Sequence, residues 1–186
     1  MNWQLDLAHS NVTFSIRHMM VTTVRGSLKI ADGTLDFDPE RPEASSVAVR
    51  IDAASIDTGA AQRDAHLRSA DFLDAETFPS IEFRSLRVER HRDDYRIHGE
   101  LTIHGVTRPV TLEAELGGVV ANLQGGQRAA FSATTKLNRE DFGLTWNVAL
   151  EQGGWLVGKE LKVEIDLAAV SVADEVDTAE AEQRIA

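Results

Sequence analysis

A chain of 186 residues is long enough to bury a sizeable core and fits one domain with a terminal tail. Its 19 basic and 30 acidic residues give a net charge of −11, the wrong sign for binding nucleic acid or an anionic lipid surface. Cysteine is absent, which excludes a disulfide, a thiolate metal ligand and a cysteine nucleophile.

The N-terminus reads MNWQLD, without a basic start, an apolar run of signal-peptide length or a small-residue cleavage pattern. On that basis we expect a cytoplasmic protein, or a periplasmic one if a leader has been removed. No run approaches the roughly 18 consecutive apolar residues that a transmembrane helix needs, so we expect no membrane insertion.

Hydrophobic residues recur at every second position along most of the chain, which is the period of strands that bury one face. A phase slip near Ser85 predicts a β-bulge, after which Leu86 and Val88 continue the alternation. The predicted strands contain residues 12–16, 28–30, 35–37, 47–51, 81–88, 95–103, 110–116, 129–137 and 161–167.

Turn-forming residues at His104 and Gly105 separate two alternating apolar runs and predict a hairpin over residues 95–116. About eight strands without helices between most of them exclude βαβ units and leave an antiparallel sandwich or a closed barrel. Because closure removes exposed edges, we favour an all-β, eight-stranded antiparallel β-barrel over residues 1–170. Residues 171–186 are acidic and poor in large apolar side chains, which predicts a disordered tail.

A polar segment from Thr58 to Phe83 interrupts the strand pattern. It predicts a short helix between strands, from about Gly59 to Ser69, with Thr58 as its N-cap. An interruption of this kind usually covers or lines a site.

Two side chains of this helix are our candidates for a pocket mouth. Arg63 and His66 lie three residues apart and therefore share a helix face that could meet a head group. In the alternative reading, Arg63 pairs with Asp57 or Asp71, and His66 caps a neighbouring carbonyl. Arg17 and His18 end the first alternating strand and are candidates for the rim.

The sequence offers little for catalysis or metal binding. His98 and His104 share a strand face, but six residues of extended chain separate them by about 20 Å, and we expect no metal site. No Gly-x-Ser-x-Gly elbow or phosphate-binding glycine loop occurs, and we assign no catalytic residue and no cofactor. Acid–base chemistry stays open as an alternative, because acidic residues cluster in the interruption: Asp64, Asp71, Asp74, Glu76 and Glu82.

Large apolar side chains lie mostly on the buried phase of the strands. Periodicity is the same for a packed core and for a cavity lining, so it does not separate the two. The candidates for a lining are Phe14, Ile16, Met19, Phe72, Phe83, Leu101, Phe131, Phe142 and Trp146.

Several motifs occur in order between residues 3 and 169. They are Asp6-x-x-His9-Ser10-x-Val12-x-Phe14, Arg63-Asp64-x-His66-Leu67, Asp71-Phe72, Phe78-Pro79-x-Ile81-x-Phe83, Gly99-x-Leu101-Thr102-Ile103-x-Gly105 and Leu137-Asn138-Arg139-x-Asp141-Phe142-Gly143-Leu144. Together they resemble the YceI-like family of lipid- and polyisoprenoid-binding proteins.

This resemblance implies a lipocalin-like barrel with an elongated internal apolar pocket. The implied ligand is a long-chain apolar molecule, such as a polyisoprenoid, a quinone tail or a fatty-acid-like lipid, and the implied role is its transport or sequestration by a homodimer. Two alternatives stay open. One is an enzyme that acts on such a lipid through Arg63, His66 and nearby carboxylates, and the other is a ligand-free interaction module with a packed core.

Overall fold

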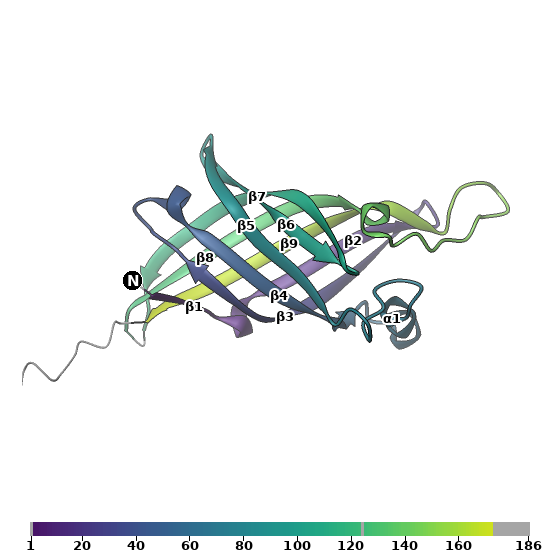
Figure 1. The fold of residues 1–186 in the computed structure, drawn as a ribbon, viewed down its shortest axis with the longest axis horizontal. Coiled ribbons are helices and arrows are strands. Elements are labelled where there is room, and N and C mark those ends of the chain that lie inside the picture. Colours follow the sequence, from purple (N-terminus) through teal and green to yellow (C-terminus); the bar gives the residue numbers. More distant parts are fainter. Residues whose placement is uncertain (1, 124, 173–186) are drawn as a thin grey trace, which may run out of the picture.

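The computed structural model describes residues 2–123 and 125–172. Nine antiparallel strands form one sheet that curves into an elongated barrel (Figure 1). The strands are β1 Asn2–Leu5, β2 Asn11–His18, β3 Thr22–Asp36, β4 Ser46–Asp57, β5 Ser80–His91, β6 Asp94–Ile103, β7 Val106–Ala121, β8 Gln127–Asn138 and β9 Val157–Val172.

The sheet closes on itself. Neighbouring strands follow the order β3-β2-β9-β8-β7-β6-β5-β4, and a further pairing of β3 with β4 completes the ring. Strands β2 to β9 therefore make the predicted eight-stranded antiparallel barrel, and the choice of a barrel over a sandwich is confirmed.

Strand β1 is a short addition that the alternating pattern did not predict. It pairs with both β3 and β9, which are also the two neighbours of β2. Strands β1 and β2 thus act as two halves of one strand, interrupted by a 3-10 helix at Leu7–His9. The Ser10 hydroxyl donates to Asp6 O and accepts from Ala168 N–H, and so ties the interruption to β9.

Two local predictions for the β5–β7 region are confirmed. The register of β5 against β6 shifts between Ser85 and Arg87, so Leu86 is the extra residue of a bulge. Leu86 is 59% exposed and does not continue the inward alternation, whereas Val88 does line the interior. Strands β6 and β7 are joined through His104 and Gly105, both with positive φ (52° and 72°), as a two-residue type I′ hairpin requires.

The two ends of the barrel are built differently. Helix α1, Ala61–Arg68, lies beside one end together with the 3-10 helix η3, Arg139–Phe142, and the loop that leads to β9; we call this the α1 end (Figure 1). The opposite end carries the 3-10 helix η2, Pro42–Ala44, and the β7–β8 connection, and we call it the η2 end.

Side chains inside the barrel form two hydrophobic clusters. The larger occupies the body of the barrel and includes Phe83 and Phe142. The smaller lies at the η2 end, where the ring of Phe37 packs edge-on against Trp3 and Phe131, with centroids 5.4 Å and 4.9 Å away. The η2 end is therefore partly filled by aromatic rings.

Strand β9 reaches Val172, two residues beyond the predicted limit of the barrel domain. The remainder of the predicted tail, residues 173–186, lies outside the described residues. Among the residues that the structure describes, no helix has the length and apolar character needed to cross a membrane.

Candidate functional site: an apolar cavity inside the barrel

An internal cavity of about 290 Å³ follows the barrel interior. Every strand from β2 to β9 contributes inward-facing residues to its wall, and the wall is almost entirely apolar. This volume is about twice the 150 Å³ of a dry cavity that holds benzene, and it lies near the lower limit of about 300 Å³ for ligand pockets. The alternation of the strands thus produces both a packed core and a lined cavity.

Six of the predicted lining residues do line the cavity: Phe14, Ile16, Phe72, Phe83, Leu101 and Phe131. Phe14 depends on a glycine in the neighbouring strand. A Cβ atom at Gly26 would lie 2.5 Å from the Phe14 ring, so the ring fits only because Gly26 has no side chain.

The remaining apolar candidates lie elsewhere. Phe142 is only 2% exposed, but it belongs to the hydrophobic core and is not part of the cavity wall. Met19 sits in the β2–β3 turn with a positive φ of 50° and is 48% exposed. Arg17 is exposed and His18 is half-buried, and neither belongs to the cavity wall.

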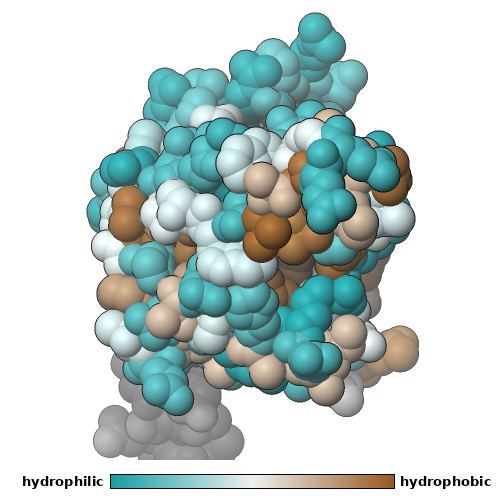
Figure 2. Space-filling view, turned by 90° about the vertical axis from the view of Figure 1, so that its right-hand side faces the viewer, coloured by the Kyte–Doolittle hydropathy of each residue, from teal (hydrophilic) through white to brown (hydrophobic). Residues whose placement is uncertain are grey.

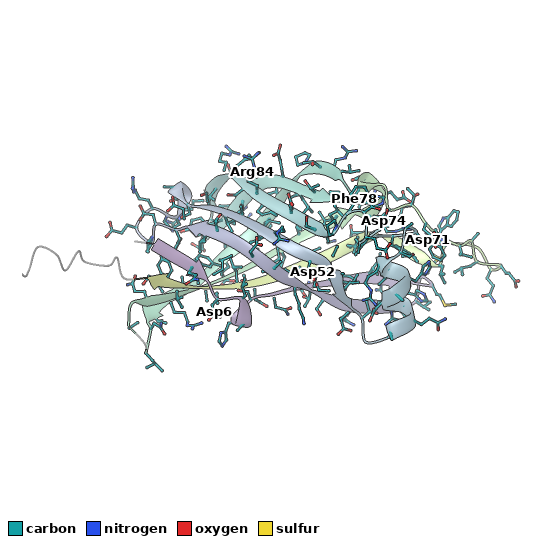
Figure 3. The ribbon with its side chains drawn as sticks, turned by 60° about the horizontal axis from the view of Figure 1, so that its bottom comes forward. Asp6, Asp52, Asp71, Asp74, Phe78 and Arg84 are labelled. Carbon is teal, nitrogen blue, oxygen red and sulfur yellow. The ribbon has the colours of Figure 1, made fainter. Side chains whose placement is uncertain are left out.

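Arg63 and His66 face different partners at the α1 end. Arg63 Nε donates to Thr58 Oγ1 (2.6 Å) and Nη2 donates to Thr58 O (2.8 Å), so Arg63 pairs with neither Asp57 nor Asp71. The Nε2 atom of His66 lies 2.8 Å from Asp71 Oδ2. Figure 3 shows Asp71 beside α1 at this end of the barrel.

An aromatic cluster connects His66 to the cavity. The His66 ring packs edge-on against Trp146 and Phe72, with centroids 4.7 Å and 5.1 Å away. Phe72 lines the cavity, so His66 reaches the wall only through that ring. Figure 2 looks onto this end and shows apolar side chains, in brown, exposed between hydrophilic ones.

Thr58 does not cap α1, contrary to the sequence prediction. The helix begins at Ala61, and Ala60 occupies the N-cap without a side-chain hydrogen bond. Thr58 donates instead to Asp64 Oδ1, through its hydroxyl at 2.5 Å and its backbone N–H at 2.9 Å. The hydroxyl bond foremost, and the N–H bond after it, hold the pKa of Asp64 below its usual value, against the opposing effect of burial.

Two acidic residues of the interruption therefore have local structural partners. The Asp64 carboxylate accepts a hydrogen bond from the Thr58 hydroxyl, and the Asp71 carboxylate is hydrogen-bonded to the His66 ring. Over residues 2–123 and 125–172, no group of three histidine or carboxylate side chains is arranged to hold a metal ion.

A buried charged residue of the cavity wall, Arg139, was not among our predicted site residues. Arg139 opens η3, lines the α1 end of the cavity and is 3% exposed. Its Nε donates to Gly158 O (2.8 Å), and its Nη1 donates to Trp146 O (2.9 Å) and to Leu144 O. Its Nη2 is buried and has no acceptor among the described residues. Burial away from water lowers the pKa of this guanidinium, and the nearby Glu140 opposes that effect.

Fold and cavity define a closed eight-stranded barrel, a class whose interior is wide enough for side chains or one small ligand. A family model described as YceI-like domain matches residues 3–169. The chain therefore belongs to the YceI-like domain family, and the resemblance seen in its motifs is confirmed.

Comparisons with individual proteins agree with this assignment. Protein YceI of Escherichia coli O17:K52:H18 (strain UMN026 / ExPEC) is 45% identical over 136 residues, which cover 73% of this chain and 71% of the relative. The crystal structure of Burkholderia cenocepacia BcnA matches with a TM-score of 0.75 at 24% identity, over 89% of this chain and 99% of the other. A domain from Saccharophagus degradans, described as a polyisoprenoid binding domain implicated in plant cell wall breakdown, matches with a TM-score of 0.64 at 14% identity, over 92% and 99%. Both solved structures are less than 25% identical to this chain, and each shows that it shares the fold.

Proposed function

We propose that the protein binds a long apolar isoprenoid or another amphiphilic lipid inside the barrel, and that it carries or sequesters this lipid. The observation that carries the proposal is the internal cavity, whose wall is apolar and is drawn from all of the strands β2 to β9. Such a wall suits a polyprenyl chain, a quinone tail or a fatty amide, because these molecules present apolar surface along most of their length.

Burial of an apolar chain against such a wall supplies enough free energy for binding without a charged contact. Each buried methylene contributes about 0.8 kcal/mol, so twenty of them contribute on the order of 16 kcal/mol gross. Loss of translational and conformational freedom then offsets much of this gain. The description of the Saccharophagus degradans neighbour as a polyisoprenoid binding domain supports the same ligand class.

The position of Arg63 and His66 favours binding over catalysis by these residues. The guanidinium of Arg63 donates to Thr58, the imidazole of His66 pairs with Asp71, and neither residue belongs to the cavity wall. The internal cavity likewise favours a ligand over a solidly packed interaction module. The homodimer expected from the resemblance stays a prediction.

A chain-length series tests the proposal. Purified protein freed of lipid is loaded with the neutral fluorophore N-phenyl-1-naphthylamine, which is then displaced by geraniol, farnesol or geranylgeraniol. We expect affinity to rise on the order of 100-fold with each added isoprene unit, because each unit buries about four further methylene equivalents at about 0.8 kcal/mol each. Protein that neither binds the fluorophore nor prefers the longer alcohols would contradict lipid binding. Chemical conversion of a retained alcohol, lost in Arg63→Ala and His66→Ala, would instead favour the enzyme alternative.

A further inference from the structure

We propose that Arg139 anchors an anionic oxygen head group, a carboxylate or a phosphate, of the lipid in the cavity. This inference rests on the proposed function, since it requires that the cavity hold a lipid chain. It adds the chemistry of the head, the residue that binds it and the direction in which the ligand lies.

The argument begins with the donors of Arg139. A guanidinium carries five N–H groups. Three of them donate to the carbonyls of Gly158, Leu144 and Trp146, and the two on Nη2 have no acceptor among the described residues. Leaving a buried donor of a charged group unpaired is costly, and the oxygen of an anionic head group would accept a hydrogen bond from Nη2.

The buried positive charge of Arg139 is a second, independent reason to expect an anionic partner. Arg139 is 3% exposed, and its three acceptors are neutral carbonyls. The carboxylate of the adjacent Glu140 is bound by Lys159 Nζ at 2.9 Å. A buried cation without an ionic partner is unfavourable, and an anionic head would supply that partner together with an acceptor for Nη2.

The position of Arg139 sets the orientation of the ligand. Arg139 lies at the α1 end, whereas the apolar rings of Trp3, Phe37 and Phe131 occupy the η2 end. The six residue steps of β8 from Phe131 to Leu137 span about 20 Å at roughly 3.3 Å per residue. An anionic head is attracted by Arg139, and the rings at the other end suit an apolar chain, so the head lies at the α1 end and the chain extends toward the η2 end.

The aromatic cluster lies on the path to the anchor. Trp146 contributes its carbonyl to Arg139 and its ring to the cluster with His66 and Phe72. The Nη2 atom is covered by surrounding atoms, so a head group reaches it after a side-chain rotation at this end.

Matched lipids that differ only in their heads test the proposal in the wild-type chain. Displacement of N-phenyl-1-naphthylamine is measured with hexadecanoate, hexadecyl phosphate and hexadecanol. We expect one or both anions to bind at least about 10-fold more tightly than the alcohol, since a hydrogen bond to a charged group is stronger than a neutral one. The tighter of the two anions identifies the head. Equal affinity for all three overturns the anionic anchor and leaves lipid binding intact, whereas failure of all three to bind contradicts the proposed function itself.

Variants assign the preference to Arg139. In Arg139→Gln the preference for the anions is expected to fall to within about twofold of the alcohol, while Arg139→Lys keeps part of it because the charge remains. Arg25→Gln, which removes an equal charge from an exposed position on β3, is the matched control and should keep the full preference. An unchanged preference in a folded Arg139→Gln protein overturns the assignment.

A crystal structure of the wild-type protein with ω-bromohexadecanoate decides the matter if the Arg139 variants do not fold. The anomalous signal of bromine is expected near the η2 end, with a carboxylate oxygen within hydrogen-bonding distance of Arg139 Nη2. Bromine beside Arg139, or a carboxylate beside Phe37, overturns the proposal.

Discussion

Replacing Ala133 by phenylalanine is expected to weaken lipid binding at least about 100-fold while the barrel stays folded. Ala133 lies on the inward phase of β8 and faces Ala114 on β7. Both alanines line the cavity. Because these side chains are small, the barrel interior beside them stays open. A benzyl group would occupy part of the path of the ligand chain. Excluding three or four methylenes, at about 0.8 kcal/mol each, corresponds to roughly 100-fold in Kd.

The adjacent residue provides the control for this substitution. Thr134 is exposed on the opposite face of β8, so Thr134→Phe adds a large ring of the same chemistry outside the cavity. Circular dichroism and urea unfolding show whether each variant keeps the fold, and displacement of N-phenyl-1-naphthylamine by geranylgeraniol gives its affinity. Full affinity in a folded Ala133→Phe protein would place the ligand outside the barrel.

Replacing Phe142 by alanine is expected to lower the free energy of unfolding by about 3–5 kcal/mol. Phe142 is 2% exposed within the main hydrophobic cluster and does not line the existing cavity, so its removal creates a new void. Phe14→Ala should cost less, because the Phe14 ring is half-buried and already faces empty space on the cavity side. Urea unfolding of the three proteins, freed of lipid, measures both differences.

The comparison between these two phenylalanines also tests where the site lies. Both residues were candidates for a lining in the sequence, whereas the structure separates them into core and cavity wall. If Phe142→Ala keeps near wild-type stability but fails to bind geranylgeraniol, Phe142 belongs to the binding site and not to the core.

Within strands, the two-residue period predicted most of the side chains that face the interior. Five of the six predicted residues found in the cavity wall come from strands: Phe14, Ile16, Phe83, Leu101 and Phe131. The bulge at Leu86 interrupts the period and turns that side chain outward. The period carries no information once a strand ends. Met19 and Arg63 lie beyond strand ends, and there turn geometry and local hydrogen bonds set the direction of each side chain.

Arg139 shows a signal that the sequence did contain. The inward phase of β8 passes through Phe131, Ala133, Thr135 and Leu137, and the next position of that phase is Arg139. An arginine at an inward position is unusual enough to mark a site. What sequence could not supply was the end of β8 or the three carbonyls that receive the guanidinium.

Thr58 and Asp64 show a different limit. Both residue types favour helix caps and turns, so propensity alone does not say which of them serves α1. The structure joins them to each other, with the Thr58 hydroxyl and N–H donating to the Asp64 carboxylate, and it leaves the helix N-terminus without a side-chain cap. A pairing between residues six positions apart is not contained in the propensity of either residue alone.

Native mass spectrometry of freshly and gently purified protein tests most directly whether the barrel interior holds a lipid. We predict a discrete adduct above the mass of the chain, which on release fragments as a prenyl or acyl compound, and which is lost in the Ala133→Phe protein but kept in the Thr134→Phe protein. The same spectrum checks the predicted homodimer. A bare chain mass that stays unchanged after incubation with geranylgeraniol and with hexadecanoate would contradict lipid binding in the barrel.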